Sequence, residues 1–88
     1  MLRGASGVAQ GTRIRVKLHP ALRRAAATTE AEQELCLPPG ATVRHLLEAF
    51  DLVHGEVGLV VVNGALAGEA QELPDGARVE LYPVFSGG

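Results

Sequence analysis

The residues with the clearest chemical potential are the last five of the 88-residue chain, 84–88, which read VFSGG. They follow Pro83 and could extend at most about 17 Å. Gly87 and Gly88 have no Cβ beside the terminal carboxylate, so a tail of this kind is narrow enough to enter another protein's active site. An attacking or attacked carboxyl terminus benefits from that access. The carboxylate is charged at neutral pH, since an α-carboxyl pKa lies near about 3.5.

Few other side chains are placed for chemistry. Cys36 has no histidine near it in sequence and falls in a strand pattern, which favours a packing or surface thiol over a nucleophile. The histidines at 19, 45 and 54 lack metal-ligand spacing such as i, i+4, which favours ordinary surface residues. One cysteine excludes an internal disulfide and a zinc finger, and is typical of a reducing compartment. We therefore expect no metal site, no cofactor bound by this chain and no catalytic residues in the enzymatic sense.

Charge is unevenly distributed along the chain. Residues 1–24 contain six basic and no acidic residues, whereas residues 25–88 contain two basic and ten acidic residues. A basic N-terminal quarter could bind nucleic acid, but Phe50, Tyr82 and Phe85, the aromatic residues, are not interleaved with it. We therefore predict no nucleic-acid partner. With no signal peptide and no apolar run near the roughly 20 residues of a spanning helix, we also expect a cytoplasmic protein without a membrane partner.

The first regular elements are two alternating segments. Basic and apolar residues alternate over 13–18, and the segment 32–37 would point Leu35 and Leu37 inward and Cys36 outward. If the two pair as an antiparallel hairpin, their basic and acidic outer faces lie opposite each other. Between them, residues 19–31 could make a helical turn that places a leucine, Leu22, inward.

A helix is predicted next, and three more strands after it. Thr42 is the expected N-cap, the apolar stripe is Val43, Leu46, Leu47 and Phe50, and His54-Gly55 is the expected end. Strands are predicted at 57–62, 65–67 and 78–83, separated by turns at 63–64 and 73–76.

This order predicts an α+β domain with the β-grasp, or ubiquitin-like, fold: a mixed sheet of four to five strands packed on one main helix. The expected organisation is a flexible N-terminal leader (1–12), the β-grasp domain (13–83) and a flexible C-terminal tail (84–88) that ends in Gly-Gly. The predicted core consists of Ile14, Val16, Leu18, Leu35, Leu37, Leu46, Leu47, Phe50, Leu59, Val61, Val79 and Leu81.

From Arg13 to Gly88 the sequence resembles the MoaD/ThiS group of ubiquitin-like sulfur carriers. The matching motifs are, in order, the opening strand with its Leu22-Arg23 loop, 39–43 (PGATV) leading into Leu46-Leu47, 62–64 (VNG), 75–79 (DGARV) and the terminal Gly87-Gly88. Each motif is modest by itself, and their order together with the diglycine is specific.

The resemblance implies a mechanism. An E1-like activating enzyme, which would use its own ATP and magnesium, adenylates Gly88, and a sulfur donor (sulfurtransferase or sulfide) displaces AMP to leave a thiocarboxylate. Gly87 and Ser86 would be the inserted tail. Phe85 and Val84 would dock against partners, although Phe85 could instead fold back on the sheet edge.

The strand end at 81–84 (LYPV) resembles the molybdopterin-synthase small subunit more than the thiamine carrier. The acceptor implied is therefore a synthase such as the molybdopterin synthase large subunit. Carriers of this group also serve thiamine, tRNA thiolation and natural products. The alternative of a different class is a ubiquitin-like protein modifier or interaction module.

Overall fold

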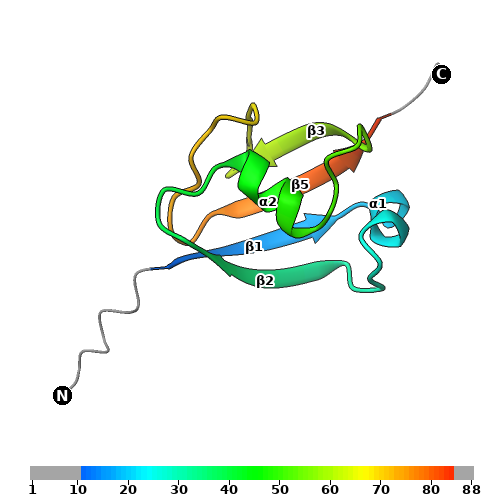
Figure 1. Cartoon of the computed structure of the whole chain (residues 1–88), viewed down its shortest axis with the longest axis horizontal. Coiled ribbons are helices and arrows are strands. Elements are labelled where there is room, and N and C mark those ends of the chain that lie inside the picture. Colours follow the sequence, from blue (N-terminus) through cyan, green and yellow to red (C-terminus); the bar gives the residue numbers. More distant parts are fainter. Residues whose placement is uncertain (1–10, 85–88) are drawn as a thin grey trace.

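The computed structural model describes residues 11–84, which form one mixed sheet and two helices (Figure 1). The elements are β1 (Thr12–Leu18), α1 (Pro20–Ala25), β2 (Glu32–Leu37), α2 (Val43–Ala49), β3 (Val57–Val62), β4 (Ala65–Leu66) and β5 (Arg78–Pro83). The strand order is β2-β1-β5-β3-β4, with β1 and β5 parallel and every other pair antiparallel. This arrangement confirms the predicted α+β class and β-grasp fold.

The predicted hairpin of β1 and β2 is confirmed, including its charge pairing. Arg15 lies across from Glu34, and Lys17 lies across from Glu32. The Arg15 guanidinium is 3.9 Å from the Glu34 carboxylate. Both side chains are well exposed, so solvent screening limits this pair to about 0.2–1 kcal/mol. The pairing therefore favours the register more than it stabilises the fold.

Helix α1 closes the end of the hairpin. Its N-cap is His19, whose Nδ1 accepts a hydrogen bond from the backbone N–H of Ala21 at 3.2 Å. Pro20 occupies the first helical position, where the absent N–H costs nothing. Leu22 is buried, as the sequence predicts.

Helix α2 begins where expected and ends earlier than expected. Thr42 is its N-cap, and the Nδ1 atom of His45 accepts the Thr42 N–H at 2.9 Å, which completes a capping box. The predicted end at His54-Gly55 is wrong, because the last helical residue is Ala49.

The early end of α2 is a Schellman motif. Asp51 has a left-handed conformation, with φ at 59°. Its N–H donates to the carbonyl of Glu48 at 3.0 Å, and the N–H of Leu52 donates to the carbonyl of Leu47 at 2.8 Å. Leu52 is 1% exposed, so its burial under the helix fixes the chain reversal at this point.

The core lies between α2 and one face of the sheet. The central strands contribute Ile14, Val16, Leu18, Val79 and Leu81, all as predicted. Helix α2 contributes Val43, Leu46 and Leu47, while Leu35, Leu37 and Phe50 are half-buried at its margin. Leu52, Leu73 and Ala77, from the connecting loops, complete it.

The prediction that Leu59 and Val61 face the core is wrong. The buried residues of β3 are Val60 and Val62, which pair with Leu81 and Val79 of β5. Because side chains directly across a strand pair share a face, the buried residues of β5 set the buried face of β3. Leu59 is 40% exposed and Val61 is only partly buried.

Neither helix in the described part of the chain is long and apolar enough to cross a membrane.

Candidate functional site

The last described residues follow directly from the central strand β5. β5 lies between β1 and β3 and ends at Pro83, and the N–H of Val84 donates to the carbonyl of Glu56 at 3.1 Å (Figure 1). The side chain of Val84 is 56% exposed. The backbone is thus held against the segment just before β3 up to residue 84, while the Val84 side chain is open to a partner.

The remaining predicted site residues, Phe85, Ser86, Gly87 and Gly88, lie outside the described residues. Their roles in docking, insertion and activation stay predictions.

Gly58 allows β3 to approach the end of β5 closely. A Cβ built at this position would lie 2.9 Å from both the carbonyl oxygen of Pro83 and the Cα of Val84. The strand register also shifts between Val57 and Leu59, which marks a bulge. Only a glycine fits this approach without displacing backbone atoms, so Gly58 helps to set where the chain leaves the sheet.

The sheet face opposite α2 carries exposed apolar side chains at its β3–β4 end. Leu66 lies across from Val61, and Tyr82 lies across from Leu59. Leu66 is 72% exposed. These four residues form what we call the apolar patch, in which Leu59 and Leu66 are exposed and Val61 and Tyr82 are partly exposed. Exposed apolar side chains grouped in this way are typical of a protein-binding surface.

Charged residues occupy the neighbouring part of the same face, which we call the charged half. β1 contributes Arg13, Arg15 and Lys17, and β5 contributes Arg78 and Glu80. The parallel register sets Arg15 beside Arg78 and Lys17 beside Glu80. A shallow depression of about 520 Å³ lies among the side chains of Arg15, Lys17, Arg78 and Glu80, bounded also by Glu32 and by the turn at 63–64. Mixed charges surround it, so it is not a simple anion site.

Tyr82 joins the apolar patch to the charged half. Its hydroxyl donates a hydrogen bond to Oε1 of Glu80 at 2.8 Å, and this bond raises the pKa of Tyr82 above its ordinary value, with desolvation adding to the effect. The ring lies 6.4 Å from that of His19, measured between centroids. Tyr82 is therefore held in one orientation on the open face.

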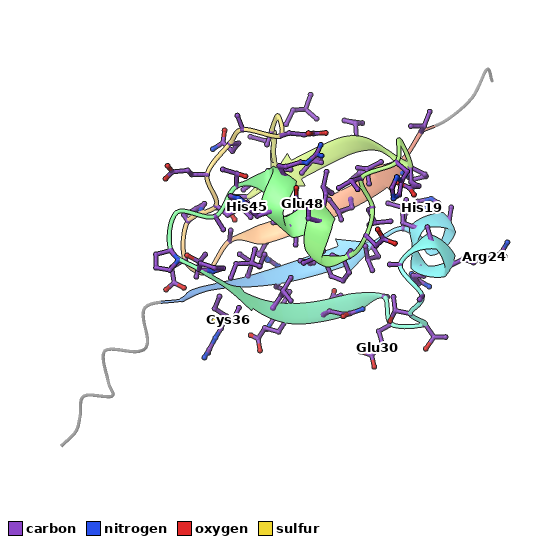
Figure 2. All side chains as sticks on the ribbon, in the orientation of Figure 1. His19, Arg24, Glu30, Cys36, His45 and Glu48 are labelled. Atoms are coloured by element: carbon purple, nitrogen blue, oxygen red, sulfur yellow. The ribbon has the colours of Figure 1, made fainter. Side chains whose placement is uncertain are left out.

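The side chains considered for other chemistry have structural positions in the described residues. Cys36 is exposed on β2 (Figure 2), as the alternation predicts. His19 and His45 cap the two helices, and His54 Nε2 lies 3.5 Å from the carboxylate of Asp51 on the surface. Within residues 11–84, no three His, Cys, Asp or Glu side chains are grouped so that they could hold a metal ion.

Sequence reasoning missed Gly58 and the apolar patch. The signal for Gly58 was a glycine inside a strand pattern, which commonly marks a bulge or a close backbone approach. The signal for the patch was that β3 is apolar on both faces, which leaves one of them for another partner.

The sheet has helix α2 packed on one face, and its last strand, β5, lies at the centre of the sheet. This arrangement defines a ubiquitin-like protein. The family described as Mut7-C ubiquitin matches residues 11–87, and the chain belongs to this family.

Solved structures give the same relationship. A Pyrococcus furiosus protein assigned as a molybdopterin converting factor, subunit 1, is 31% identical, with a TM-score of 0.66, over 82% of this chain and 97% of that one. This similarity confirms the resemblance predicted from the sequence motifs.

Two Haloferax volcanii proteins share the fold at lower identity. The protein HVO 2177 is 19% identical, with a TM-score of 0.73, over 90% of this chain and 89% of that one. The modifier protein SAMP1 is 22% identical, with a TM-score of 0.65, over 86% of this chain and 99% of that one. Comparison with curated proteins gives no significant match.

Proposed function

We propose that this chain is a sulfur carrier whose reactive group is the carboxylate of Gly88. In the proposed reaction, a carboxylate oxygen attacks the α-phosphorus of ATP and pyrophosphate leaves, which gives an acyl-adenylate. Sulfide then attacks the acyl carbon and AMP leaves, so the product is a thiocarboxylate. If the donor is a sulfurtransferase persulfide, the same attack gives an acyl disulfide, and a thiol then cleaves its S–S bond to release the thiocarboxylate and leave a disulfide. An E1-like enzyme binds the ATP and magnesium, and the carrier supplies only its terminus.

The observation that carries this proposal is the 31% identity over 97% of a protein assigned as a molybdopterin converting factor, subunit 1. The exposed Val84 at the end of the central strand and the sequence Gly87-Gly88 agree with it. On the same ground, we propose molybdopterin biosynthesis as the pathway and a molybdopterin synthase large subunit as the acceptor. Thiamine, tRNA thiolation and natural-product sulfur transfer are the alternative destinations of the sulfur.

The apolar patch is the proposed docking surface for these larger partners. Leu59 of β3 and Tyr82 of β5 lie across from each other close to the start of the tail, and Leu66 of β4 lies on the same face farther along β3, across from Val61. Leu66 is 72% exposed, so covering it completely removes from water apolar area worth at most about 1.5–3 kcal/mol, before the entropic cost of association. A partner that covers the patch would hold residues 84–88 close to its own active site.

The test is the intact mass of the chain after coexpression with an E1-like enzyme and a sulfur donor. A carrier gains the mass difference of one oxygen replaced by sulfur, located at Gly88 by fragmentation. A chain without Gly88 should keep its melting temperature and lose ATP-dependent adenylation. Undiminished adenylation of the shortened chain would refute the proposal.

The same measurement distinguishes the second class of function. A protein modifier would give a branched peptide in which the Gly88 carboxyl is joined to a lysine of another protein. A chain with neither product, in the presence of active enzymes, would be an interaction module.

A further inference from the structure

Strand β2 has an outer edge that pairs with no other strand within residues 11–84. On β1, the N–H of Arg15 donates to Ala77 at 3.0 Å, and the carbonyl of Arg13 accepts from Gly76 at 2.7 Å. The backbone groups of these odd-numbered residues therefore point toward β5. Those of the even-numbered residues point toward β2, as the bond from the Leu18 N–H to the Ala31 carbonyl at 2.8 Å shows.

The same alternation decides which groups of β2 are free. The register sets Ile14 across from Leu35, and each hydrogen-bonded pair in an antiparallel ladder uses the backbone groups of both residues. The backbone N–H and C=O groups of Glu32, Glu34 and Cys36 consequently point outward, away from β1. An extended segment laid beside β2 would find these three residues ready to pair.

The two faces of this edge differ sharply in chemistry. On the open face, Glu32 and Glu34 are exposed carboxylates. On the face toward α2, Leu35 and Leu37 are only half-buried. Beyond them lies a hollow of about 280 Å³, lined by Leu37, residues 38–41 and the α2 side chains His45 and Glu48.

We propose that the β2 edge binds an extended segment of a partner protein in which basic residues alternate with apolar ones. Strand addition uses free backbone groups for affinity and alternate side chains for specificity. The basic side chains of such a segment would lie beside Glu32 and Glu34, and its apolar side chains would extend the row of Leu35 and Leu37 toward the hollow. Figure 2 shows Cys36 at this outer edge, and His45 and Glu48 on α2.

Charge also argues against a second copy of the chain as the occupant. In such a dimer, the β2 edges of two chains would pair antiparallel through the outward N–H and C=O groups of Glu32 and Glu34. Glutamates of one chain would then lie directly across from glutamates of the other, which destabilises a strand pair. Arg15 approaches Glu34 only at 3.9 Å, with both side chains more than half exposed, so this carboxylate remains accessible to a further cation. Pro38 has no N–H and ends the pairing edge.

The experiment uses the full chain and a blocked six-residue peptide of alternating lysine and valine. We expect slower amide hydrogen exchange at Glu32, Glu34 and Cys36 when the peptide binds, because their N–H groups become hydrogen-bonded. A peptide of alternating glutamate and valine, and a lysine–valine peptide with the two residue types in separate blocks, should give no such protection.

Substitutions on the protein separate charge from backbone pairing. Glu34→Lys should weaken binding about fivefold to tenfold, since one favourable cross-strand pair becomes a repulsive one. Glu72→Lys, the same change at an exposed loop position, should leave it within about twofold. Cys36→Pro should also reduce protection at Glu32 and Glu34 while leaving both carboxylates and the β1–β2 pairing in place, because the N–H that it removes points outward.

Three results would overturn the proposal. One is equal binding of the glutamate–valine peptide. Another is protection confined to β3 and β4. The third is protection at residues 32–36 that rises with protein concentration alone, together with a dimer mass, because a second copy would then occupy the edge.

Discussion

Replacing Gly58 with alanine tests whether the close approach of β3 to the end of β5 positions the start of the tail. The added Cβ would stand 2.9 Å from the Pro83 carbonyl oxygen and from the Val84 Cα. Carbon atoms in favourable contact lie about 3.5–4.0 Å apart, so backbone atoms must move by several tenths of an ångström. Flexible side chains cannot absorb this change, because both neighbours are backbone atoms.

The expected cost follows from two opposing effects. Overpacking of this kind costs about 1–3 kcal/mol. Replacing a glycine lowers the entropy of the unfolded chain and returns about 0.4–1 kcal/mol. With the middle of each range, the net loss in the free energy of unfolding for Gly58→Ala is about 1.3 kcal/mol. In a domain of this size, that loss corresponds to a melting temperature lower by roughly 5–10 °C.

Urea unfolding of Gly58→Ala and Gly68→Ala provides the matched comparison. A Cβ at Gly68 meets no atom within 4 Å, so Gly68→Ala should be neutral or slightly stabilising. We also expect faster amide exchange at Val84 in Gly58→Ala only, since its bond to Glu56 lies at the displaced segment. Equal midpoints for the two variants, with equal exchange at Val84, would refute the reasoning.

Three further predictions concern the patch, its tyrosine and the end of α2. Leu66→Asp should raise the KM for the carrier in adenylation, because it places a charge in the apolar patch. Ala70→Asp adds the same charge at an exposed loop position and should leave the KM unchanged. Equal effects of the two substitutions would show that the apolar patch is not a docking surface. Absorbance titration should place the pKa of Tyr82 above about 10, and Glu80→Gln should lower it. The hydrogen bond to Glu80 makes the pKa of Tyr82 higher in the folded chain than in the unfolded chain. Its contribution to the free energy of unfolding is therefore fully present below the unfolded pKa and is lost as the pH rises through the folded pKa. In urea unfolding, the free energy of unfolding of Asp51→Gly should exceed that of Asp51→Ala by about 1 kcal/mol, because residue 51 has a left-handed φ that glycine adopts without strain. The reverse order of stability would contradict this prediction.

Strands and turns could be predicted because their signals are local. The bounds of β2, β3 and β5 agree with the sequence prediction to the residue. Alternation defines β2 and β5, a short apolar run defines β3, and a proline or an Asn-Gly turn marks the end of each strand. The turn at Asn63-Gly64 is also as expected, with φ of 50° and 86° at its two residues. In these segments, local preference and tertiary structure agree.

The end of α2 required tertiary information. A glycine at 55 is a stronger local stop signal than the aspartate at 51, and the helical pattern allowed either. Burial of Leu52 selects the earlier stop, because a helix continued through Asp51 would carry that leucine away from the core. A single sequence does not show which of two competing stops the core will favour.

The orientation of β3 could not be predicted for a related reason. Because β3 is apolar at nearly every position, alternation does not distinguish the two faces. Pairing of Val60 with Leu81 and of Val62 with Val79 settles it, and the bulge at Gly58 follows from the same register. The apolar patch can therefore be identified only from the pairing of β3 with β5, which shows that Leu59 and Val61 lie on the face opposite α2.

The two proposed binding surfaces lie toward opposite edges of one sheet, so each can be tested without disturbing the other. The apolar patch spans β4, β3 and β5, whereas the free edge belongs to β2, with β1 between them. A strand added at β2 would extend the sheet outward and leave Leu66 and Val84 uncovered, so both partners could be bound together. Charge reversal at Glu34 should therefore leave activation of Gly88 unchanged, because sites without shared contacts contribute independently. A carrier built in this way could be held by one protein at its β2 edge while another acts on its terminus.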